Sequence, residues 1–406
     1  MLTGATGFVG MELLARFLES SDRHIVALVR AADDEQATAR VRATIAATCG
    51  ECNGHAERIT AVAGDLTAPR LGLGDRWAPL AERVGAIVHG AASVAFDLPL
   101  DESRVINVEG TQRMLDFARA CPGLERFTYV STAYVAGDRR GTVYEDDTEP
   151  GRFRNAYERS KHEAERLVAA CSDEIDLTIV RPSIVVGDQR TGWTAAFNVL
   201  YAPLRAFAAG VIPVVPARRR SPVDVVPVDY VADAVHALAE APEASGQTFH
   251  IVAGQHASTV GEIVAMAEAR FATRTPRLIP PRAYHAIVEP IVAKRAPASA
   301  RRLLKSTEPY FPYFAMRLRF DDARARAVLE PRGIHAAPLA TYFDRLIDYA
   351  QAARWLRTTT AAVAAIAAAT APMTSSGTTT VSTSASHSAA SRAHQMTQAR
   401  TAPGWR

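Results

Sequence analysis

The sequence predicts an α/β protein with a doubly wound parallel sheet, followed by a smaller, mostly helical C-terminal region. Over the first 250 residues, short runs rich in Val and Ile alternate with amphipathic helical patterns. Continuous apolar runs of this kind are typical of parallel strands that are covered on both faces. A glycine-rich turn stands at the first junction of strand and helix. A Rossmann-like sheet places a dinucleotide at that point.

Each apolar run is expected to form a strand. These runs cover residues 24–30, 59–66, 86–93, 126–135, 177–188 and 247–252. The clearest helical patterns between them are Gly10 to Ser20, Val108 to Ala120 and Lys161 to Ala170. Alternation at this spacing implies right-handed crossovers, which build a doubly wound sheet.

The first strand is unusually short. Only Met1 and Leu2 precede Thr3, whereas a strand normally has about five residues. We hypothesise that the true start of the protein lies upstream of Met1.

Composition divides the chain into three parts. Residues 1–254 form the predicted dinucleotide-binding domain, with a substrate-side insertion at about 187–222. Residues 255–356 are expected to form a smaller helical substrate region, in which proline-rich stretches separate the helical patterns 259–272, 283–294, 321–330 and 338–350. Residues 357–406 are almost all Ala, Thr, Ser, Gly, Gln and Arg. They cannot bury enough apolar surface to offset the entropy of ordering, so we predict a disordered tail.

The overall composition excludes several classes of protein. Hydrophobic residues make up 48% and charged residues 22% of the chain, as in ordinary globular proteins. With 46 basic and 43 acidic residues, the charge is too balanced to predict a nucleic-acid partner, and no apolar stretch is long enough for a transmembrane segment. Four cysteines in 406 residues predict a reducing cytoplasm. Cys49 and Cys52, with His55 nearby, have no second pair to complete a zinc site, so we predict no metal.

The opening residues indicate dinucleotide binding. Three glycines have the spacing G-x-x-G-x-x-G and stand directly before a helical pattern. Glycine lets backbone N–H groups approach a pyrophosphate, and the helix N-terminus supplies partial positive charge. The candidate cofactor-binding residues of this turn are Thr3, Gly4, Thr6, Gly7, Phe8, Val9 and Gly10.

The end of the second strand favours NADPH over NADH. An acidic residue there would bind a ribose hydroxyl of adenosine, but the chain has Arg30, and Arg40 follows on the next helix. Two guanidinium groups suit a 2′-phosphate; the alternative is a solvated helix face. Five further residues at strand ends are expected to face the cofactor: Asp65 and Leu66 beside the adenine, and the small residues Gly90, Ala91 and Ala92.

A candidate proton-transfer pair lies on the third helix. Tyr157 and Lys161 are four residues apart and therefore share one helix face. A nearby ammonium favours phenolate and lowers the pKa of the phenol. We therefore expect Tyr157 to exchange a proton with a carbonyl oxygen near neutral pH, which a free tyrosine with a pKa of about 10 does inefficiently. The preceding strand supplies Ser131 and Thr132 as hydroxyl donors.

The motifs TGATGFVG, GDL, HGAAS, VSTAYVAG and YERSK, in this order, resemble the extended short-chain dehydrogenase/reductase family over about residues 1–255. The resemblance implies that Thr132, Tyr157 and Lys161 form a catalytic triad. It also implies that Asn107 orders a water near the lysine, with a surface helix residue as the alternative. The resemblance also places Pro182 and Ser183, which lie in the run 177–188, against the nicotinamide.

A narrower resemblance points to one branch. GDLTAPRLGL, AASVAFDLPLDESRVINVEGTQRMLDFAR and FRNAYERSKHEAERLV are similar to fatty acyl-CoA reductases and to the thioester reductase domains of carboxylic acid reductases. The segments YFPYF and FDDARARAVL are also similar to bacterial relatives of this branch. The resemblance implies NADPH-dependent reduction of an acyl thioester to aldehyde or alcohol. The substrate would arrive as an acyl-CoA or on a separate acyl carrier protein.

Three other functions stay open at this point: a nucleotide-sugar epimerase or dehydratase with tightly held NAD, a sterol or alcohol dehydrogenase, and a non-enzymatic redox sensor that binds NADP. Arg218, Arg219 and Arg220 could hold the phosphates of CoA or phosphopantetheine, or form an exposed basic turn. Asp229 and Tyr230 are expected to be structural.

Overall fold

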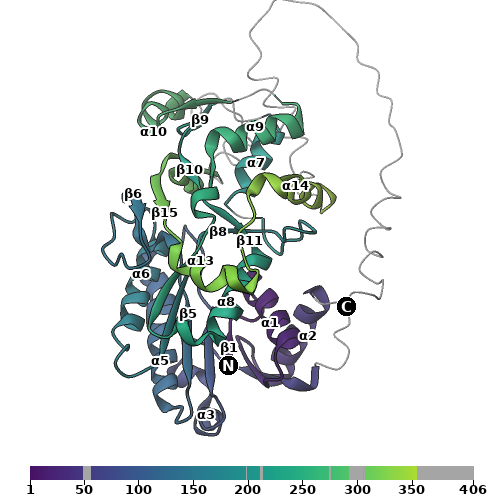
Figure 1. Cartoon of the computed structure of the whole chain (residues 1–406), viewed down its shortest axis with the longest axis vertical. Helices are drawn as coiled ribbons and strands as arrows, with labels where there is room; N and C mark the ends of the chain where they lie inside the picture. The colour runs from purple at the N-terminus through teal and green to yellow at the C-terminus, as the bar shows by residue number, and fades with distance from the viewer. Residues whose placement is uncertain are drawn as a thin grey trace, which may run out of the picture.

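The computed structural model describes residues 1–48, 56–197, 199–210, 214–273, 276–291, 305 and 307–353. The sheet and its helices form the lower part of Figure 1, and α7, α9, α10 and α14 lie in the upper part. The cysteine pair Cys49 and Cys52, His55 and the predicted tail 357–406 lie outside the described residues.

Seven parallel strands form the central sheet in the order β12-β7-β5-β4-β1-β2-β3. The strands are β1 (Leu2–Thr3), β2 (Ile25–Val29), β3 (Ile59–Ala63), β4 (Ala86–His89), β5 (Arg126–Val130), β7 (Leu177–Pro182) and β12 (Gln247–Ile251). The strand order reverses between β1 and β4, and open α/β sheets bind ligands at such a switch point. The predicted fold class is confirmed.

Every apolar run contains a strand, but most strands end before their run does. β4 ends at His89 and β5 at Val130, because the chain then turns out of the sheet. The run 177–188 splits into β7 and β8 (Ile184–Val186), and β8 pairs with β11 (Val225–Pro227) instead of the central sheet. Pro182 ends β7, and proline has no N–H with which to continue a ladder.

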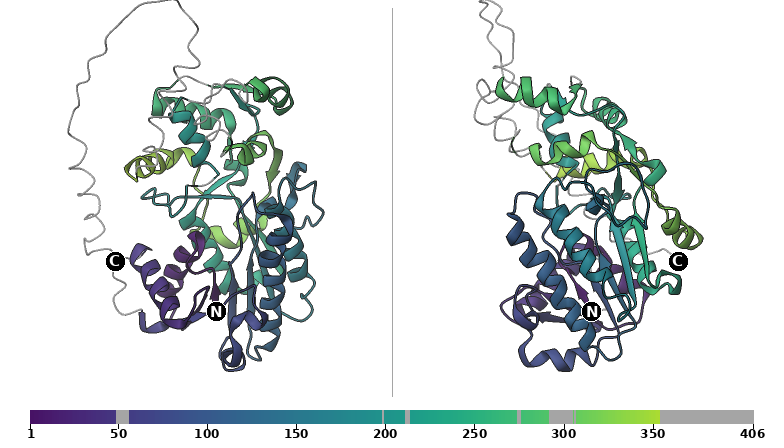
Figure 2. Two further views of the ribbon diagram at one scale, coloured as in Figure 1. Left: turned by 180° about the vertical axis from the view of Figure 1, so that it is seen from behind. Right: turned by 90° about the vertical axis from the view of Figure 1, so that its left-hand side faces the viewer.

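Helices cover both faces of the sheet (Figure 2). One layer contains α1 (Phe8–Ser20), α2 (Asp34–Thr48) and α8 (Val228–Glu240). The other contains α3 (Trp77–Ala81), α4 (Leu100–Arg104), α5 (Gly110–Ala120) and α6 (Ala156–Ala169). Leu14 and Phe17 of α1 pack with Val231 of α8 in one core, and Met114 of α5 packs with Val168 of α6 in another. Apolar burial on both faces stabilises the layers.

The predicted helix from Val108 begins differently in the structure. A π-helix, η4 (Val105–Glu109), continues α4 and leads into α5. A π-helical turn is rare and is frequently found at functional sites. α6 begins at Ala156, before the predicted pattern Lys161 to Ala170, because the Asn155 side chain accepts a hydrogen bond from the Glu158 N–H at 2.9 Å and caps the helix.

The upper part of the molecule combines segments that are far apart in the sequence. The helices α7 (Tyr201–Ala208), α9 (Val260–Phe271) and α14 (Phe343–Ala352) lie there (Figure 1), together with the parallel pair β9 (Val214–Pro216) and β14 (Arg277–Ile279). Residues of α7 share one apolar core with α9 and α14, so the predicted insertion 187–222 packs with the C-terminal region.

Shorter elements complete the fold. They are β6 (Arg140–Val143), β10 (Pro222–Val223), β13 (Ser258–Thr259), α10 (Pro281–Ala283), the π-helix η8 (Tyr284–Val288), the 3-10 helix η9 (Glu308–Ala315), β15 (Arg317–Phe320) and α13 (Ala323–Leu329). α13 returns to the lower part and packs on β12 and α8. Of the predicted helix 283–294, residues from 292 lie outside the described chain. Across the described ranges, each helix is too short or too polar to cross a bilayer.

Candidate active site

A cleft of about 640 Å³ opens at the carboxyl ends of the central strands. All the candidate cofactor residues line it: Thr3, Gly4, Thr6, Gly7, Phe8, Val9, Gly10, Arg30, Arg40, Asp65, Leu66, Gly90, Ala91, Ala92, Tyr157, Lys161, Pro182 and Ser183. Thr132 lines it as well, whereas Asn107 does not. The structure therefore brings the glycine turn and the candidate triad into one cleft.

The glycine turn is tightly packed against its neighbours. Gly4 has a φ of +77°, which favours glycine. A Cβ on Gly4 would lie 2.8 Å from the Ala91 nitrogen, and a Cβ on Gly10 would lie 1.9 Å from the Gly4 carbonyl oxygen. Only glycine therefore lets α1 approach β1 this closely. Gly7 is the N-cap of α1 and makes no side-chain cap, so the first helical N–H groups suit an anionic group.

The two arginines lie together at the far end of the cleft. Arg30 follows β2, and the Arg40 guanidinium on α2 donates a hydrogen bond to the Arg30 carbonyl. Both side chains are exposed. Within the described ranges, neither guanidinium forms an ion pair with a carboxylate. Two such cations at the end of β2 suit a phosphate on the adenosine ribose.

Lys161 is buried under the cleft. Only 3% of the residue is exposed, and its Nζ donates to the Tyr129 hydroxyl at 2.8 Å and to the Val130 carbonyl at 2.8 Å. Its Nζ also lies 4.3 Å from the centre of the Tyr129 ring. Desolvation lowers the pKa of Lys161 to about 7, although the Glu165 carboxylate opposes this change. The ammonium form is therefore closely balanced with the amine near neutral pH.

The expected acidity of Tyr157 is wrong. Burial raises the pKa of its phenol to about 12, and the interaction with the Thr132 hydroxyl only partly offsets this. Desolvation disfavours phenolate, and the Lys161 ammonium donates instead to Tyr129 and Val130. Tyr157 therefore stays protonated at neutral pH, which suits a proton donor.

A buried histidine connects the glycine turn with α5. His89 Nε2 lies 3.2 Å from Thr111 Oγ1. His89 Nδ1 lies 2.7 Å from Thr3 Oγ1. Because burial and the Lys161 charge lower the pKa of His89 to about 3, the imidazole is neutral. Thr111 donates to a backbone carbonyl at 2.6 Å, so the network assigns the proton of His89 to Nε2.

Asn107 lies in the π-helix and is 2% exposed, so it is not a surface helix residue. Its Oδ1 accepts from the Ser93 N–H at 2.7 Å, and its Nδ2 donates to the Ser93 carbonyl at 3.1 Å and to Ser160 Oγ at 2.9 Å. Ser160 in turn donates to the Tyr157 carbonyl at 3.1 Å. Asn107 therefore connects the segment after β4 with α6.

An aromatic cluster beside Tyr157 was not predicted from the sequence. Phe96 stacks on Tyr157 with ring centres 5.6 Å apart and on Tyr313 at 5.5 Å. The Tyr313 hydroxyl donates to the fully buried Glu158 carboxylate at 2.7 Å, and Tyr134 packs edge-on against Tyr313. Phe96, Tyr134 and Tyr313 all line the cleft. Tyr313 follows Tyr157 by 156 residues, and no local pattern indicates that they meet.

The other candidates lie outside the cleft. Arg218, Arg219 and Arg220 are exposed in a turn before β10 and do not line it. Asp229 accepts from the Gln189 side chain at 2.8 Å, and Tyr230 packs in the core, as expected of structural residues. Over the part of the chain that is described, no group of three His, Cys, Asp or Glu residues could hold a metal.

Comparison with known proteins gives a consistent result. A family model described as "Male sterility protein" matches residues 2–235. The isonitrile lipopeptide synthase of Streptomyces coeruleorubidus is 37% identical over 222 residues, which are 52% of this chain and 15% of that protein. The L-2-aminoadipate reductase large subunit of Penicillium chrysogenum is 33% identical over 62% of this chain and 19% of its own length. The chain thus spans a small part of these curated relatives.

Two solved structures resemble most of the chain. The terminal R domain of the myxalamid PKS-NRPS biosynthetic pathway has a TM-score of 0.76 and 28% identity, covering 87% of this chain and 90% of that one. The reductase domain of a nonribosomal peptide synthetase from Mycobacterium tuberculosis has a TM-score of 0.63 and 26% identity, covering 86% and 90%. These findings confirm the resemblance to the thioester reductase branch of extended short-chain dehydrogenases/reductases.

Proposed function

This chain belongs to the family described as male sterility protein, and from that premise we propose that it is an NADPH-dependent reductase of acyl thioesters. The observation that carries the proposal is the meeting of Thr132, Tyr157 and Lys161 with the glycine turn in one cleft. The relatives whose names describe reductases support the same reaction class. The substrate is an acyl group carried by CoA or by a carrier protein.

The residues of the cleft fit a dinucleotide. The turn Gly4–Gly10 would hold the pyrophosphate, since a Cβ at Gly4 or Gly10 would collide with backbone atoms around it. Arg30 and Arg40 would bind the 2′-phosphate that distinguishes NADPH from NADH. When bound, the reduced nicotinamide supplies a hydride.

Thr132 and Tyr157 act on the carbonyl oxygen of the substrate. Negative charge develops on this oxygen as the carbonyl carbon is reduced, and two hydroxyl donors stabilise it. Tyr157 then gives its proton to the oxygen, which its raised pKa allows because the phenol is protonated at neutral pH. Because the Lys161 ammonium donates to Tyr129 and Val130, it would act on the phenolate that remains through its charge and not through a hydrogen bond.

The products follow from the balance of atoms. A thioester that gains one hydride and one proton becomes a hemithioacetal, which breaks its C–S bond to release an aldehyde and a thiol. A second hydride and a second proton convert the aldehyde into an alcohol. Tyr157 regains its proton from solvent between the two steps.

The first test replaces the proton donor. We expect Tyr157→Phe to lower kcat by about 10²- to 10⁴-fold and to leave NADPH affinity nearly unchanged, because only a hydroxyl is removed. Tyr144→Phe is the matched control, since the Tyr144 side chain is exposed and away from the cleft. A variant with full turnover would refute the role of Tyr157.

The second test separates the functions that the motifs leave open. Loss of NADPH absorbance is followed with acyl-CoAs, carrier-bound acyl groups, free aldehydes, ketosteroids and sugar nucleotides. Reduction of thioesters supports the proposal. Turnover of sugar nucleotides or ketosteroids alone would refute the proposed thioester reduction. Binding of NADPH with no turnover of any substrate would favour the non-enzymatic redox sensor.

A further inference from the structure

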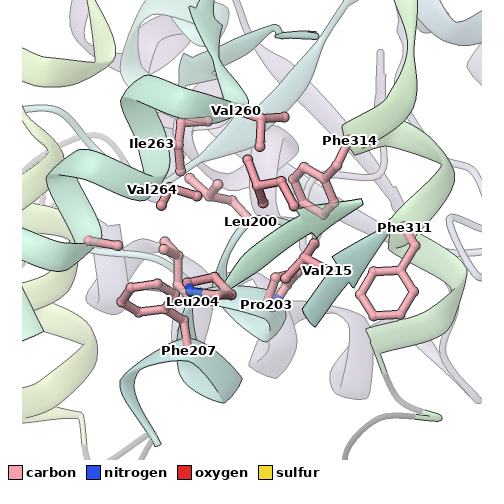
Figure 3. A pocket seen from close by; sticks show the side chains of 13 residues that line it. Leu200, Pro203, Leu204, Phe207, Val215, Val260, Ile263, Val264, Phe311 and Phe314 are labelled. Atoms are coloured by element: carbon pink, nitrogen blue, oxygen red, sulfur yellow. The ribbon is translucent and has the colours of Figure 1, made fainter. Parts of the chain in front are cut away.

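A second cavity lies in the C-terminal region, between α7, α9, β9 and η9 (Figure 3). Each of its lining residues is Ala, Val, Leu, Ile, Phe or Pro. Figure 3 shows Leu204 and Phe207 of α7, Ile263 of α9, and Phe314 of η9 around one common space. Purely apolar pockets are not suited to water, which needs polar partners.

This pocket adjoins the cleft through two pairs of consecutive residues. On η9, Tyr313 lines the cleft and Phe314 lines the pocket. Before α7, Val199 lines the cleft and Leu200 lines the pocket. Tyr313 and Tyr157 both stack on the Phe96 ring, so the pocket lies near the part of the cleft that contains the proton donor.

We propose that this pocket binds the aliphatic end of the acyl group, an inference that rests on the proposed thioester reduction. A thioester presents two arms to the enzyme. The pantetheine arm contains amides, and burying an amide without hydrogen-bond partners is unfavourable. The lining residues offer no polar side chain, so only the hydrocarbon arm suits this space.

The size of the pocket sets the length of chain that it accepts. Its volume is about 60 Å³, whereas a cavity of about 150 Å³ holds the six carbons of benzene. The pocket therefore has room for about two to three carbons. Each methylene that it buries should raise kcat/KM about fourfold.

The test is a chain-length series of acyl-CoAs from acetyl to dodecanoyl, with kcat/KM measured for the full chain and NADPH. We expect kcat/KM to rise about fourfold per methylene over about two to three carbons, followed by a plateau. Ala267→Leu fills the pocket and should end the rise at a shorter chain, whereas Val264→Ala should extend it. Ala269→Leu, at an exposed position of α9, is the matched control and should leave the profile unchanged.

The outcomes distinguish the pocket from the reaction. A flat profile with efficient reduction of all thioesters overturns the pocket proposal and leaves the proposed function intact. A profile that responds to neither Ala267→Leu nor Val264→Ala also overturns it. If no thioester is reduced, the proposed function fails and the pocket proposal fails with it. Thermal unfolding shows whether each variant is folded. Val264→Ala makes a side chain smaller, so it tests the pocket even if the larger side chain of Ala267→Leu disturbs folding.

Discussion

Replacing Tyr129 by phenylalanine should change the pH at which the enzyme loses activity. Tyr129 is 1% exposed and accepts a hydrogen bond from Lys161 Nζ at 2.8 Å. The Tyr129→Phe change keeps the ring against the ammonium but removes this acceptor. Because the site is buried, solvent does not replace the lost partner. The charged form of Lys161 is therefore destabilised relative to the amine.

The size of the effect follows from the contact. A hydrogen bond to a charged group contributes about 1.5–3 kcal/mol, and one pKa unit corresponds to about 1.4 kcal/mol. The pKa of Lys161 is already lowered to about 7 by burial. The ammonium predominates below this pH and the amine above it, so loss of the acceptor moves the transition toward acid by about one to two pH units. Of the groups that face Lys161, Glu165 raises its pKa and His89 stays neutral.

The assay is kcat/KM between pH 5 and 9 for the parent protein, Tyr129→Phe and the exposed control Tyr144→Phe. We expect the activity of Tyr129→Phe to decline at lower pH than that of the other two. At acidic pH, where Lys161 is still charged, the three proteins should be more alike than at pH 7. A uniform loss of rate with an unchanged alkaline limb would refute the role of Tyr129 in holding the ammonium.

Three further changes test other parts of the site. Gly10→Ala should abolish NADPH binding in a fluorescence titration and lower the Tm, because the new Cβ would lie 1.9 Å from the Gly4 carbonyl oxygen. The control is Gly123→Ala, where a Cβ has open space, and it should change neither NADPH binding nor the Tm. Arg30→Ala should raise the KM for NADPH about tenfold and leave the KM for NADH unchanged; equal effects on both would exclude a 2′-phosphate contact. Tyr313→Phe should lower the free energy of unfolding by about 1–2 kcal/mol in urea titrations, because the buried Glu158 carboxylate on α6 loses a hydrogen-bond donor. An unchanged urea midpoint would show that this hydrogen bond does not stabilise the fold.

Local patterns predicted several residues that the structure gathers in the cleft. The spacing of Gly4, Gly7 and Gly10 located the turn, and the four-residue spacing of Tyr157 and Lys161 placed both on one face of α6, where both line the cleft. The electrostatics were not predictable in the same way. The pKa of Tyr157 depends on burial and on where the Lys161 ammonium donates, and both follow from packing.

The sequence by itself determined the parallel sheet and the glycine turn, because these depend on periodicity and spacing within a few residues. The candidate triad came from the resemblance of the motifs to a known family. The tertiary structure alone decided that Phe96 stacks on both Tyr157 and Tyr313, that Tyr129 accepts a hydrogen bond from Lys161, that His89 bonds Thr3, and that an apolar pocket adjoins the cleft. These contacts join segments tens to hundreds of residues apart. No local pattern encodes such a meeting, since the packing of the whole chain brings the segments together.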